Sequence, residues 1–149
     1  MKKNKIRILL ADDDLDDCLL FAEALKDIPI TTELMTIPNG EKLMTFLAKS
    51  KKKLPDVLFL DLNMPRKNGF SSLNEIKRNP ELEHLPVIIF STATEDEKVR
   101  QVYKDAAHYY IRKPATFSEL KTILIKALTL ISSKGMPLVM KENFEIKAD

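Results

Sequence analysis

The chain has 149 residues, which is enough for one well-packed domain and too few for two domains of ordinary size. Hydrophobic residues make up 44% of the chain and charged residues 31%, the balance of a globular protein rather than of a disordered or membrane-embedded chain. The 24 Lys and Arg nearly cancel the 22 Asp and Glu, so the net charge of +2 does not indicate a nucleic-acid partner.

The N-terminus and the cysteine content predict a cytoplasmic protein. Cys18 is the single cysteine, which excludes a disulfide within the chain and fits a reducing compartment. The opening residues, MKKNKIRILLADDD, are basic, but their apolar run is too short for a signal peptide and ends in three acids. No apolar stretch reaches the length of a membrane span. We therefore expect no membrane association.

The first half of the chain is predicted to run strand, helix, strand, helix. Residues 6–11 and 32–37 are apolar or β-branched runs of strand length. The inner face of the helix between them is predicted to consist of Leu19, Leu20, Ala22 and Leu25. The inner face of the second helix is predicted to consist of Leu43, Met44, Phe46 and Leu47.

The second half continues the alternation. Residues 57–60 (VLFL) and 87–90 (VIIF) are apolar at every position, which is typical of central strands covered on both faces. The helix between them is expected to begin near Asn68 and to stop at Asn79-Pro80. A weaker helical pattern over residues 95–105 precedes a fifth strand at residues 109–111.

The last helix has the clearest pattern. Thr116 and Glu119 have the spacing of a capping box at its start. Apolar residues then keep the i, i+3, i+4, i+7 spacing of one helix face: Phe117, Leu120, Ile123, Leu124, Ala127, Leu128 and Ile131. Residues 133–149 lose this period. We expect a domain of residues 1–132 and a loosely ordered C-terminal tail of residues 133–149, with a short strand or a partner contact as the alternative for the tail.

Alternating strands and helices predict an α/β fold, in which parallel strands are joined by right-handed crossovers and helices cover both faces of one sheet. Polar side chains follow four of the five expected strands. Three aspartates (residues 12–14) follow the first strand, Asp61 the third, Ser91 and Thr92 the fourth, and Lys113 the fifth. If the strand order is 2-1-3-4-5, these groups meet at the carboxyl edge of the sheet, where ligands bind in open α/β folds.

Each of these groups has an ordinary structural explanation when taken alone. Acids after a strand often cap the next helix, hydroxyls at a strand end often bond to the backbone, and a lysine before a proline is usually a surface residue. Such explanations do not account for the joint occurrence at four adjacent strand ends.

The electrostatics of this edge predict a cation. Carboxylates of Asp12, Asp13 and Asp61 about 5 Å apart would repel by roughly 3 kcal/mol per pair at an effective dielectric near 20. Lys113 offsets only part of three negative charges, so either the carboxyl pKa values rise or a cation binds. A site with few carboxylates and open water positions suits Mg²⁺ better than Ca²⁺. The bound ion would then have room for a phosphoryl oxygen.

Four motifs, LLADDD, FLDLNMPRKNGF, VIIFSTA and YYIRKP, resemble those of the receiver (chemotaxis-type) domain of two-component response regulators. They follow the family's order, and the resemblance covers about residues 6–131. The stretches DDDLDDCLLFAEAL, DLNMPRKNGF and KRNPELEHLPVIIFST are similar to lone receivers of the phytochrome-associated kind. The resemblance implies a doubly wound, flavodoxin-like (βα)5 fold with a five-stranded parallel sheet in the order 2-1-3-4-5.

The resemblance also implies which residues bind metal and phosphate. Asp61 would be the phosphoacceptor. Asp12 and Asp13 would be the acidic pair that holds Mg²⁺, with Asp13 the direct ligand and Asp12 acting through water. Asp61 and the backbone carbonyl of Asn63 would complete the set of protein ligands.

The remaining motifs would carry the response to phosphorylation. Ser91 corresponds to the switch hydroxyl, Lys113 to the lysine that pairs with the phosphoryl oxygens, and Tyr110 to the switch aromatic residue. Pro114 stands where the family keeps a cis proline.

Receivers of this kind are phosphoproteins of two-component phosphorelay signal transduction rather than turnover enzymes. They accept a phosphoryl group from the phosphohistidine of a sensor histidine kinase or a histidine phosphotransfer protein, and they signal through the face made by helix 4, strand 5 and helix 5. Too few residues follow the last helix for a helix-turn-helix module. We therefore expect an unknown downstream protein as the target, with a homodimer through the same face as a further expectation.

Three alternatives remain. A phosphatase of the haloacid dehalogenase type needs an aspartate two residues after its nucleophile, and Asn63 stands there and cannot transfer protons. A flavodoxin-like cofactor binder needs a phosphate loop where this chain has three acids. A receiver that is never phosphorylated could act as a constitutive docking module, against which the intact Asp61, Asp13, Ser91 and Lys113 speak.

Overall fold

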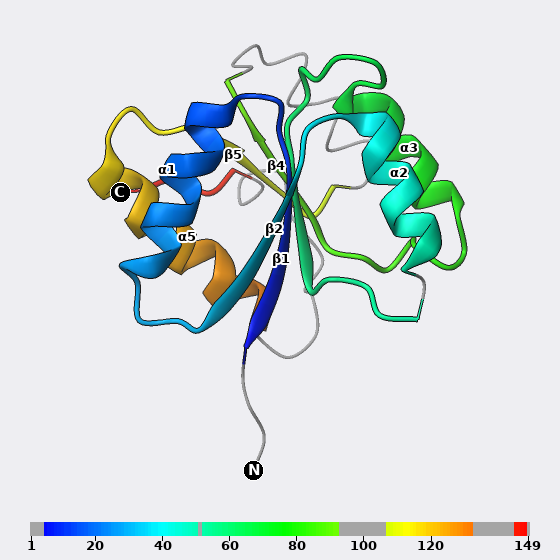
Figure 1. Cartoon of the computed structure of the whole chain (residues 1–149). Coiled ribbons are helices and arrows are strands. Elements are labelled where there is room, and N and C mark those ends of the chain that lie inside the picture. Colours follow the sequence, from blue (N-terminus) through cyan, green and yellow to red (C-terminus); the bar gives the residue numbers. More distant parts are fainter. Residues whose placement is uncertain (1–4, 51, 93–106, 133–144, 149) are drawn as a thin grey trace.

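The computed structural model describes residues 5–50, 52–92, 107–132 and 145–148. A five-stranded sheet forms the centre of the molecule (Figure 1). Its strands are β1 (Ile6–Ala11), β2 (Thr32–Ile37), β3 (Val57–Leu60), β4 (Val87–Ser91) and β5 (Tyr109–Arg112). All neighbouring strands are parallel, in the order β2-β1-β3-β4-β5, which confirms the predicted fold class and strand order.

Helices cover both faces of this sheet. Figure 1 shows α1 (Leu15–Lys26) and α5 (Phe117–Ser132) on one face, and α2 (Gly40–Lys49) and α3 (Gly69–Arg78) on the other. The third helix begins and ends where the sequence predicts. The helix predicted over residues 95–105 lies outside the described residues.

A hydrophobic core lies on each face of the sheet. β3 and β4 are buried at every position, because alternate side chains of a strand point into opposite cores. Toward α1 and α5, the ring of Phe21 packs edge-on against Phe59 and Phe90, with centroids 5.1 and 5.4 Å apart. Leu58 and Ile89 belong to the core under α2 and α3. Each such side chain stabilises the fold by about 1.5–3 kcal/mol, so the strand ends that carry the site are firmly held.

The four described helices begin at polar side chains that the sequence places before them. Backbone N–H groups of the first turns donate to side-chain oxygens of Asp14, Asn39, Asn68 and Thr116. Such a cap contributes about 1 kcal/mol to helix stability. The bond from Glu119 N–H to Thr116 Oγ1 is 3.1 Å long, in agreement with the predicted cap of the last helix.

The inner face predicted for the first helix is wrong in part. Leu19 and Leu20 are 61% and 49% exposed, and the buried residues of α1 are Cys18, Phe21, Ala24 and Leu25. Apolar residues occupy every position from 18 to 22, so the sequence offers two overlapping helical faces. The face that contains Phe21 is buried because that ring fits between Phe59 and Phe90.

The last described residues, 145–148, pack against β5 and α5. Glu145 forms an isolated parallel bridge with Tyr110, and the backbone N–H of Ile146 donates to the carbonyl of Tyr110 at 2.8 Å. Ile146 is buried in the core on the α1–α5 face. Lys126 of α5 donates through Nζ to the carbonyls of Lys147 and Ala148, at 2.8 and 2.9 Å. This end of the chain therefore lies along the edge strand of the sheet.

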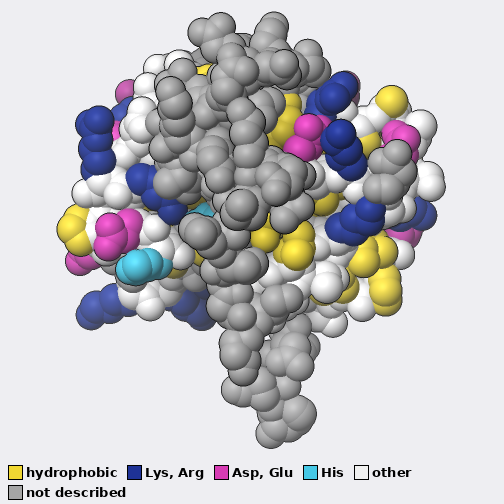
Figure 2. Space-filling view, turned by 180° about the vertical axis from the view of Figure 1, so that it is seen from behind, with side chains coloured by type: hydrophobic (Ala, Val, Ile, Leu, Met, Phe, Trp, Pro, Cys, Tyr) yellow, Lys and Arg dark blue, Asp and Glu magenta, His cyan; other side chains and the backbone are white. Residues whose placement is uncertain are grey.

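The described surface carries charges of both signs. Seen from behind, basic and acidic side chains occur on both sides of the molecule, as the small net charge leads one to expect (Figure 2). Among the described helices, none has the length and apolar character that crossing a bilayer requires.

Candidate functional site

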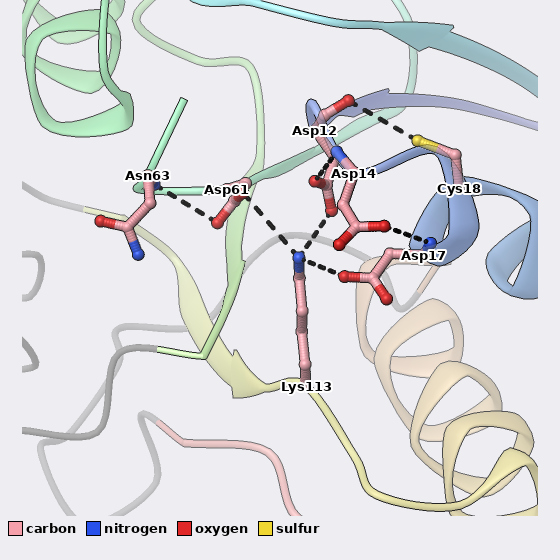
Figure 3. A network of polar contacts seen from close by, with 7 residues as sticks. All are labelled: Asp12, Asp14, Asp17, Cys18, Asp61, Asn63 and Lys113. Atoms are coloured by element: carbon pink, nitrogen blue, oxygen red, sulfur yellow. Dashed lines mark hydrogen bonds and ion pairs between the residues drawn. The ribbon is translucent and has the colours of Figure 1, made fainter. Parts of the chain in front are cut away.

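Backbone hydrogen bonds hold the predicted site residues at the carboxyl edge of the sheet. The N–H of Asp12 donates to Ile37 at the end of β2, and the N–H of Asp61 donates to Ala11 at the end of β1, both at 2.9 Å. The N–H of Lys113 donates to the carbonyl of Ser91 at 3.0 Å. Asp12, Asp61 and Lys113 each lie one residue past a strand end and still hydrogen-bond to the neighbouring strand. Their side chains therefore lie close together, although the residues are far apart in the sequence (Figure 3).

Three carboxylates form the acidic part of the site. Asp12, Asp13 and Asp61 each offer an oxygen, and these atoms lie within 4.8 Å of one another. Asp12 and Asp61 are only 2% and 4% exposed, whereas Asp13 is exposed. Two of the three carboxylates are therefore withdrawn from water, and the third faces the solvent.

Lys113 lies between these acids and helix α1. Its Nζ is 2.8 Å from Asp12 Oδ2, 2.8 Å from Asp17 Oδ2 and 3.8 Å from Asp61 Oδ2 (Figure 3). The side chain is only 11% exposed, and the ammonium lies 5.6 Å from the centre of the Phe90 ring. One lysine therefore reaches the phosphoacceptor candidate and two further carboxylates.

Burial and neighbouring charges shift the pKa values of Asp12 and Lys113. Burial raises the pKa of Asp12 to about 6, and the Asp61 charge acts in the same direction, while Lys113 acts against both. Burial alone would lower the pKa of Lys113, but its bonds to Asp12 and Asp17, together with the Asp61 charge, raise that pKa above the usual range. The lysine is thus firmly charged, and the acids beside it hold more negative charge than it neutralises.

Both oxygens of Asp12 have partners within the site. Oδ1 accepts a hydrogen bond from the Asp14 N–H at 2.9 Å. Oδ2 is buried and forms an ion pair with Lys113 Nζ at 2.8 Å. Three carboxylate oxygens within 4.8 Å of one another, from Asp12, Asp13 and Asp61, match the oxygen ligands that a hard divalent ion prefers.

The loop after β3 packs closely against the strand end that carries Asp61. A Cβ on Gly69 would collide with the backbone carbonyl of Asp61, so only glycine allows α3 to start this close to the strand end. Arg66 adopts a left-handed φ of 69°, which tightens the turn. The N–H of Asn63 donates to Asp61 Oδ1 at 3.4 Å, and this bond orients the carboxylate (Figure 3). The stiff turn therefore positions an aspartate rather than merely reversing the chain.

The two predicted switch residues lie in the sheet beside the acids. Ser91 ends β4 and is fully buried. Tyr110 is paired with Ile89 in the sheet and is 2% exposed, so its ring occupies the buried position in this structure. Pro114 follows a trans peptide bond, since no cis bond occurs among the described residues, and the cis bond implied by the resemblance is absent there.

Sequence reasoning missed one member of the site, Asp17. Its carboxylate comes from the first turn of α1 and contacts a lysine 96 positions later. The available signal was an acid four residues after Asp13 at the start of a helix, which alone indicates only a favourable charge near the helix N-terminus. Cys18 beside it is buried, and burial raises the pKa of its thiol to about 11, in keeping with the predicted packing role.

Comparison with known proteins identifies the family of this arrangement. Residues 8–125 match the family described as "Response regulator receiver domain". A curated relative, "Response regulator Rcp1" of Synechocystis sp., is 33% identical over 117 residues, which cover 76% of this chain and 80% of that protein.

Solved structures of response regulators have the same fold as this chain. The "Mn(2+)-bound form of response regulator Rcp1" superposes with a TM-score of 0.75 at 29% identity, covering 89% of this chain and 99% of that one. The "Phosphorylated Cyanobacterial Phytochrome Response Regulator RcpA" gives a TM-score of 0.80 at 30% identity, covering 90% and 99%. The predicted similarity to phytochrome-associated receivers is therefore confirmed.

Proposed function

The chain belongs to the response regulator receiver family, and on this premise we propose that it accepts a phosphoryl group on Asp61 from a phosphohistidine, with Mg²⁺ bound beside it. It is a receiver protein and not an enzyme that turns over external substrates. The observation that carries the proposal is the position of Asp61: a buried carboxylate at a strand end, with two other carboxylates and one lysine within reach.

The metal ligands in this proposal are Asp13, Asp61 and the backbone carbonyl of Asn63, with Asp12 acting through water. A bound divalent ion would neutralise charge on the carboxylates and on the incoming phosphoryl oxygens. The 4.8 Å spacing of the carboxylate oxygens of Asp12, Asp13 and Asp61 supports this assignment. A relative has been crystallised in an "Mn(2+)-bound form", which supports a divalent ion here without specifying Mg²⁺.

Phosphoryl transfer from phosphohistidine to Asp61 requires one covalent step of the protein, the attack by the carboxylate. An oxygen of Asp61 attacks the phosphorus of phosphohistidine, the P–N bond breaks, and the imidazole leaves with the bonding electron pair. Catalysis then consists of holding the carboxylate in line and neutralising charge. β3 and the Gly69 turn supply the rigidity, and Lys113, 3.8 Å away, supplies a positive charge for the phosphoryl oxygens.

The response to phosphorylation would pass through Ser91 and Tyr110. The phosphoryl group adds negative charge and acceptor oxygens at Asp61. Ser91, on the neighbouring strand, would donate its hydroxyl to one of them, and the packing of Tyr110 would adjust. The face containing β5 and α5 would then carry the signal to a downstream protein. Homodimerisation through this face stays a prediction, which light scattering with and without beryllofluoride tests.

A protein donor needs a surface beside Asp61, and α1 offers one. Leu15, Leu19 and Leu20 are exposed by 75%, 61% and 49%, and their helix begins directly after the acidic loop. We place the contact with a histidine kinase or phosphotransfer protein there, in the cytoplasm. Changing Leu15 and Leu19 to Asp should abolish transfer from a kinase that phosphorylates the wild type, while labelling by acetyl phosphate continues. Equal loss with both donors would contradict this surface.

The proposal as a whole is tested by intact-protein mass spectrometry after incubation with acetyl phosphate. With Mg²⁺ the chain should gain one phosphoryl group, and with EDTA it should gain none. Steady hydrolysis of a phosphomonoester such as p-nitrophenyl phosphate without a labelled protein would instead favour the phosphatase alternative.

A further inference from the structure

The ammonium group of Lys113 has a carboxylate partner that the transfer reaction does not require. Asp17 Oδ2 lies 2.8 Å from Nζ, as close as Asp12 and closer than Asp61 at 3.8 Å (Figure 3). The side chain of Lys113 is 11% exposed and that of Asp17 is 33% exposed, so water screens this pair only in part. The lysine expected to serve the phosphoryl group is therefore held from the opposite side by helix α1.

Helix capping does not explain the carboxylate of Asp17. An acid in the third position of a helix commonly accepts a hydrogen bond from the backbone N–H of the capping residue. Here that N–H, from Asp14, donates to Asp12 Oδ1 at 2.9 Å. The backbone N–H of Asp17 is satisfied by the Asp14 side chain at 3.0 Å. The Asp17 carboxylate is thus left for Lys113, to which it is joined by a 2.8 Å hydrogen bond.

We propose that Asp17 is a positioning residue that holds Lys113 toward α1 and competes with the phosphoryl group on Asp61 for its ammonium. This inference rests on the proposed function and deepens it. Before phosphorylation, Asp17 and Asp12 share the lysine. Afterwards the phosphoryl oxygens on Asp61 attract it more strongly, because the acyl phosphate carries roughly one and a half to two negative charges at neutral pH, where the free carboxylate carries one. Asp17 would thereby lower the stability of the phosphorylated state.

The competition makes a quantitative prediction for beryllofluoride, a phosphoryl mimic that adds to the acceptor carboxylate. In the presence of Mg²⁺, Asp17→Asn should bind it about three- to tenfold more tightly than the wild type, the effect of losing one partly screened ion pair. Asp17→Glu keeps the charge and should stay near the wild-type affinity. Asp16→Asn is the matched control, because it removes the same charge from the same helical turn at an exposed position.

A second measurement follows Lys113 itself. In nitrogen-15 spectra of side-chain ammonium groups, the Lys113 signal should shift when beryllofluoride is added to the wild type. The same signal should already be displaced in unliganded Asp17→Asn and unchanged in Asp16→Asn. Since this readout needs no phosphoryl transfer, it separates the contact from the activity.

The outcomes distinguish this inference from the function on which it rests. Tighter beryllofluoride binding and a displaced Lys113 signal in Asp17→Asn alone support it. A wild type that binds beryllofluoride, together with equal behaviour of Asp17→Asn and Asp16→Asn, would overturn the positioning role and leave the proposed function intact. A wild type that does not bind beryllofluoride at all would overturn both.

Discussion

Strand β3 has an aspartate directly before it and another directly after it, and the two have opposite surroundings. Asp56, at the amino end, is exposed, and its Oδ2 accepts a hydrogen bond from the Arg7 N–H at 2.7 Å. The backbone N–H of Asp56 donates in turn to the carbonyl of Arg7 at 2.8 Å. Asp61, at the carboxyl end, is 4% exposed and lies within 4.8 Å of oxygens from two other carboxylates.

The same contrast holds along the two edges of the sheet. At the amino edge, Arg7 donates to the Leu54 carbonyl at 2.8 Å, and His108 Nδ1 accepts from the Val87 N–H at 3.1 Å. The side chains of Arg7, Asp56 and His108 there each form a hydrogen bond with a backbone group. At the carboxyl edge, within the part of the chain that the structure describes, the carboxylates of Asp12, Asp17 and Asp61 share Lys113. One edge is built for stability, and the other retains uncompensated charge that suits a ligand.

The sharpest test of this contrast exchanges one atom at each end of β3. Asp61→Asn should abolish phosphoryl incorporation from acetyl phosphate, because the amide is not a nucleophile. Asp56→Asn should leave incorporation unchanged. Intact-mass spectrometry of both variants measures the difference. Labelling that survives in Asp61→Asn would move the acceptor to another residue.

Mg²⁺ affinity should depend on Asp13, at the carboxyl edge, and not on an acid outside the site. Asp13→Ala should weaken Mg²⁺ binding at least about tenfold, since it removes a direct, negatively charged ligand. Asp16→Ala removes an exposed acid from the first turn of α1 and should change the affinity less than about twofold. Titration calorimetry suits the measurement, because the chain has no tryptophan for fluorescence. Equal affinities in the two variants would remove the metal assignment.

The two edges should respond to pH with opposite sign. Burial lowers the pKa of His108 from 6.5 to about 4, so between these values the unfolded chain binds a proton that the folded protein rejects. This contribution to stability is complete above pH 6.5 and is lost as the pH falls toward 4. Burial raises the pKa of Asp12 from 3.8 to about 6, so its contribution is complete below pH 3.8 and is lost as the pH rises through 6.

Urea unfolding without metal, between pH 4 and 7, separates the two effects. In His108→Gln the free energy of unfolding should fall by about 1–2 kcal/mol less between pH 7 and pH 4 than in the wild type, a difference that takes the partial exposure of the ring into account. His84→Gln is the control, because the His84 side chain is 92% exposed. Asp12→Asn should stabilise the protein at pH 7 more than at pH 4. The same pH slope in all three variants and the wild type would contradict the assignment.

The smallest effect is expected for truncation at the amino edge. Asp56→Ala removes the acceptor for the Arg7 N–H and should lower the free energy of unfolding by about 1 kcal/mol, the value of one partly exposed hydrogen bond. Acetyl phosphate labelling should not change. A variant as stable as the wild type would show that water replaces the carboxylate without cost.

Much of the fold could be predicted because its signals are local. Residues 57–60 form a strand as predicted, since an unbroken apolar run can be buried on both faces of a sheet. Asn68 caps α3 and Asn79 ends it, because each has a side chain or a following proline that favours the boundary. The inner face of α1 could not be fixed in the same way, since the choice between Leu19 and Phe21 depends on the rings across the core.

The site was predictable where topology alone brings residues together. Asp12, Asp61 and Lys113 each follow a strand, and neighbouring parallel strands end at one edge. The contact between Asp17 and Lys113 depends on how far helix α1 lies from β5 and on which way its first turn faces, and the sequence pattern contains neither quantity.

The central claim, that the carboxyl edge makes Asp61 the phosphoacceptor, is tested most directly by trapping the acyl phosphate. Borohydride reduces an aspartyl phosphate to homoserine, which peptide mass spectrometry can locate. After incubation with acetyl phosphate and Mg²⁺, homoserine should appear at position 61 and nowhere else, and it should be absent when EDTA replaces the metal. Homoserine at another aspartate, or at position 61 to the same extent in EDTA, would contradict the account.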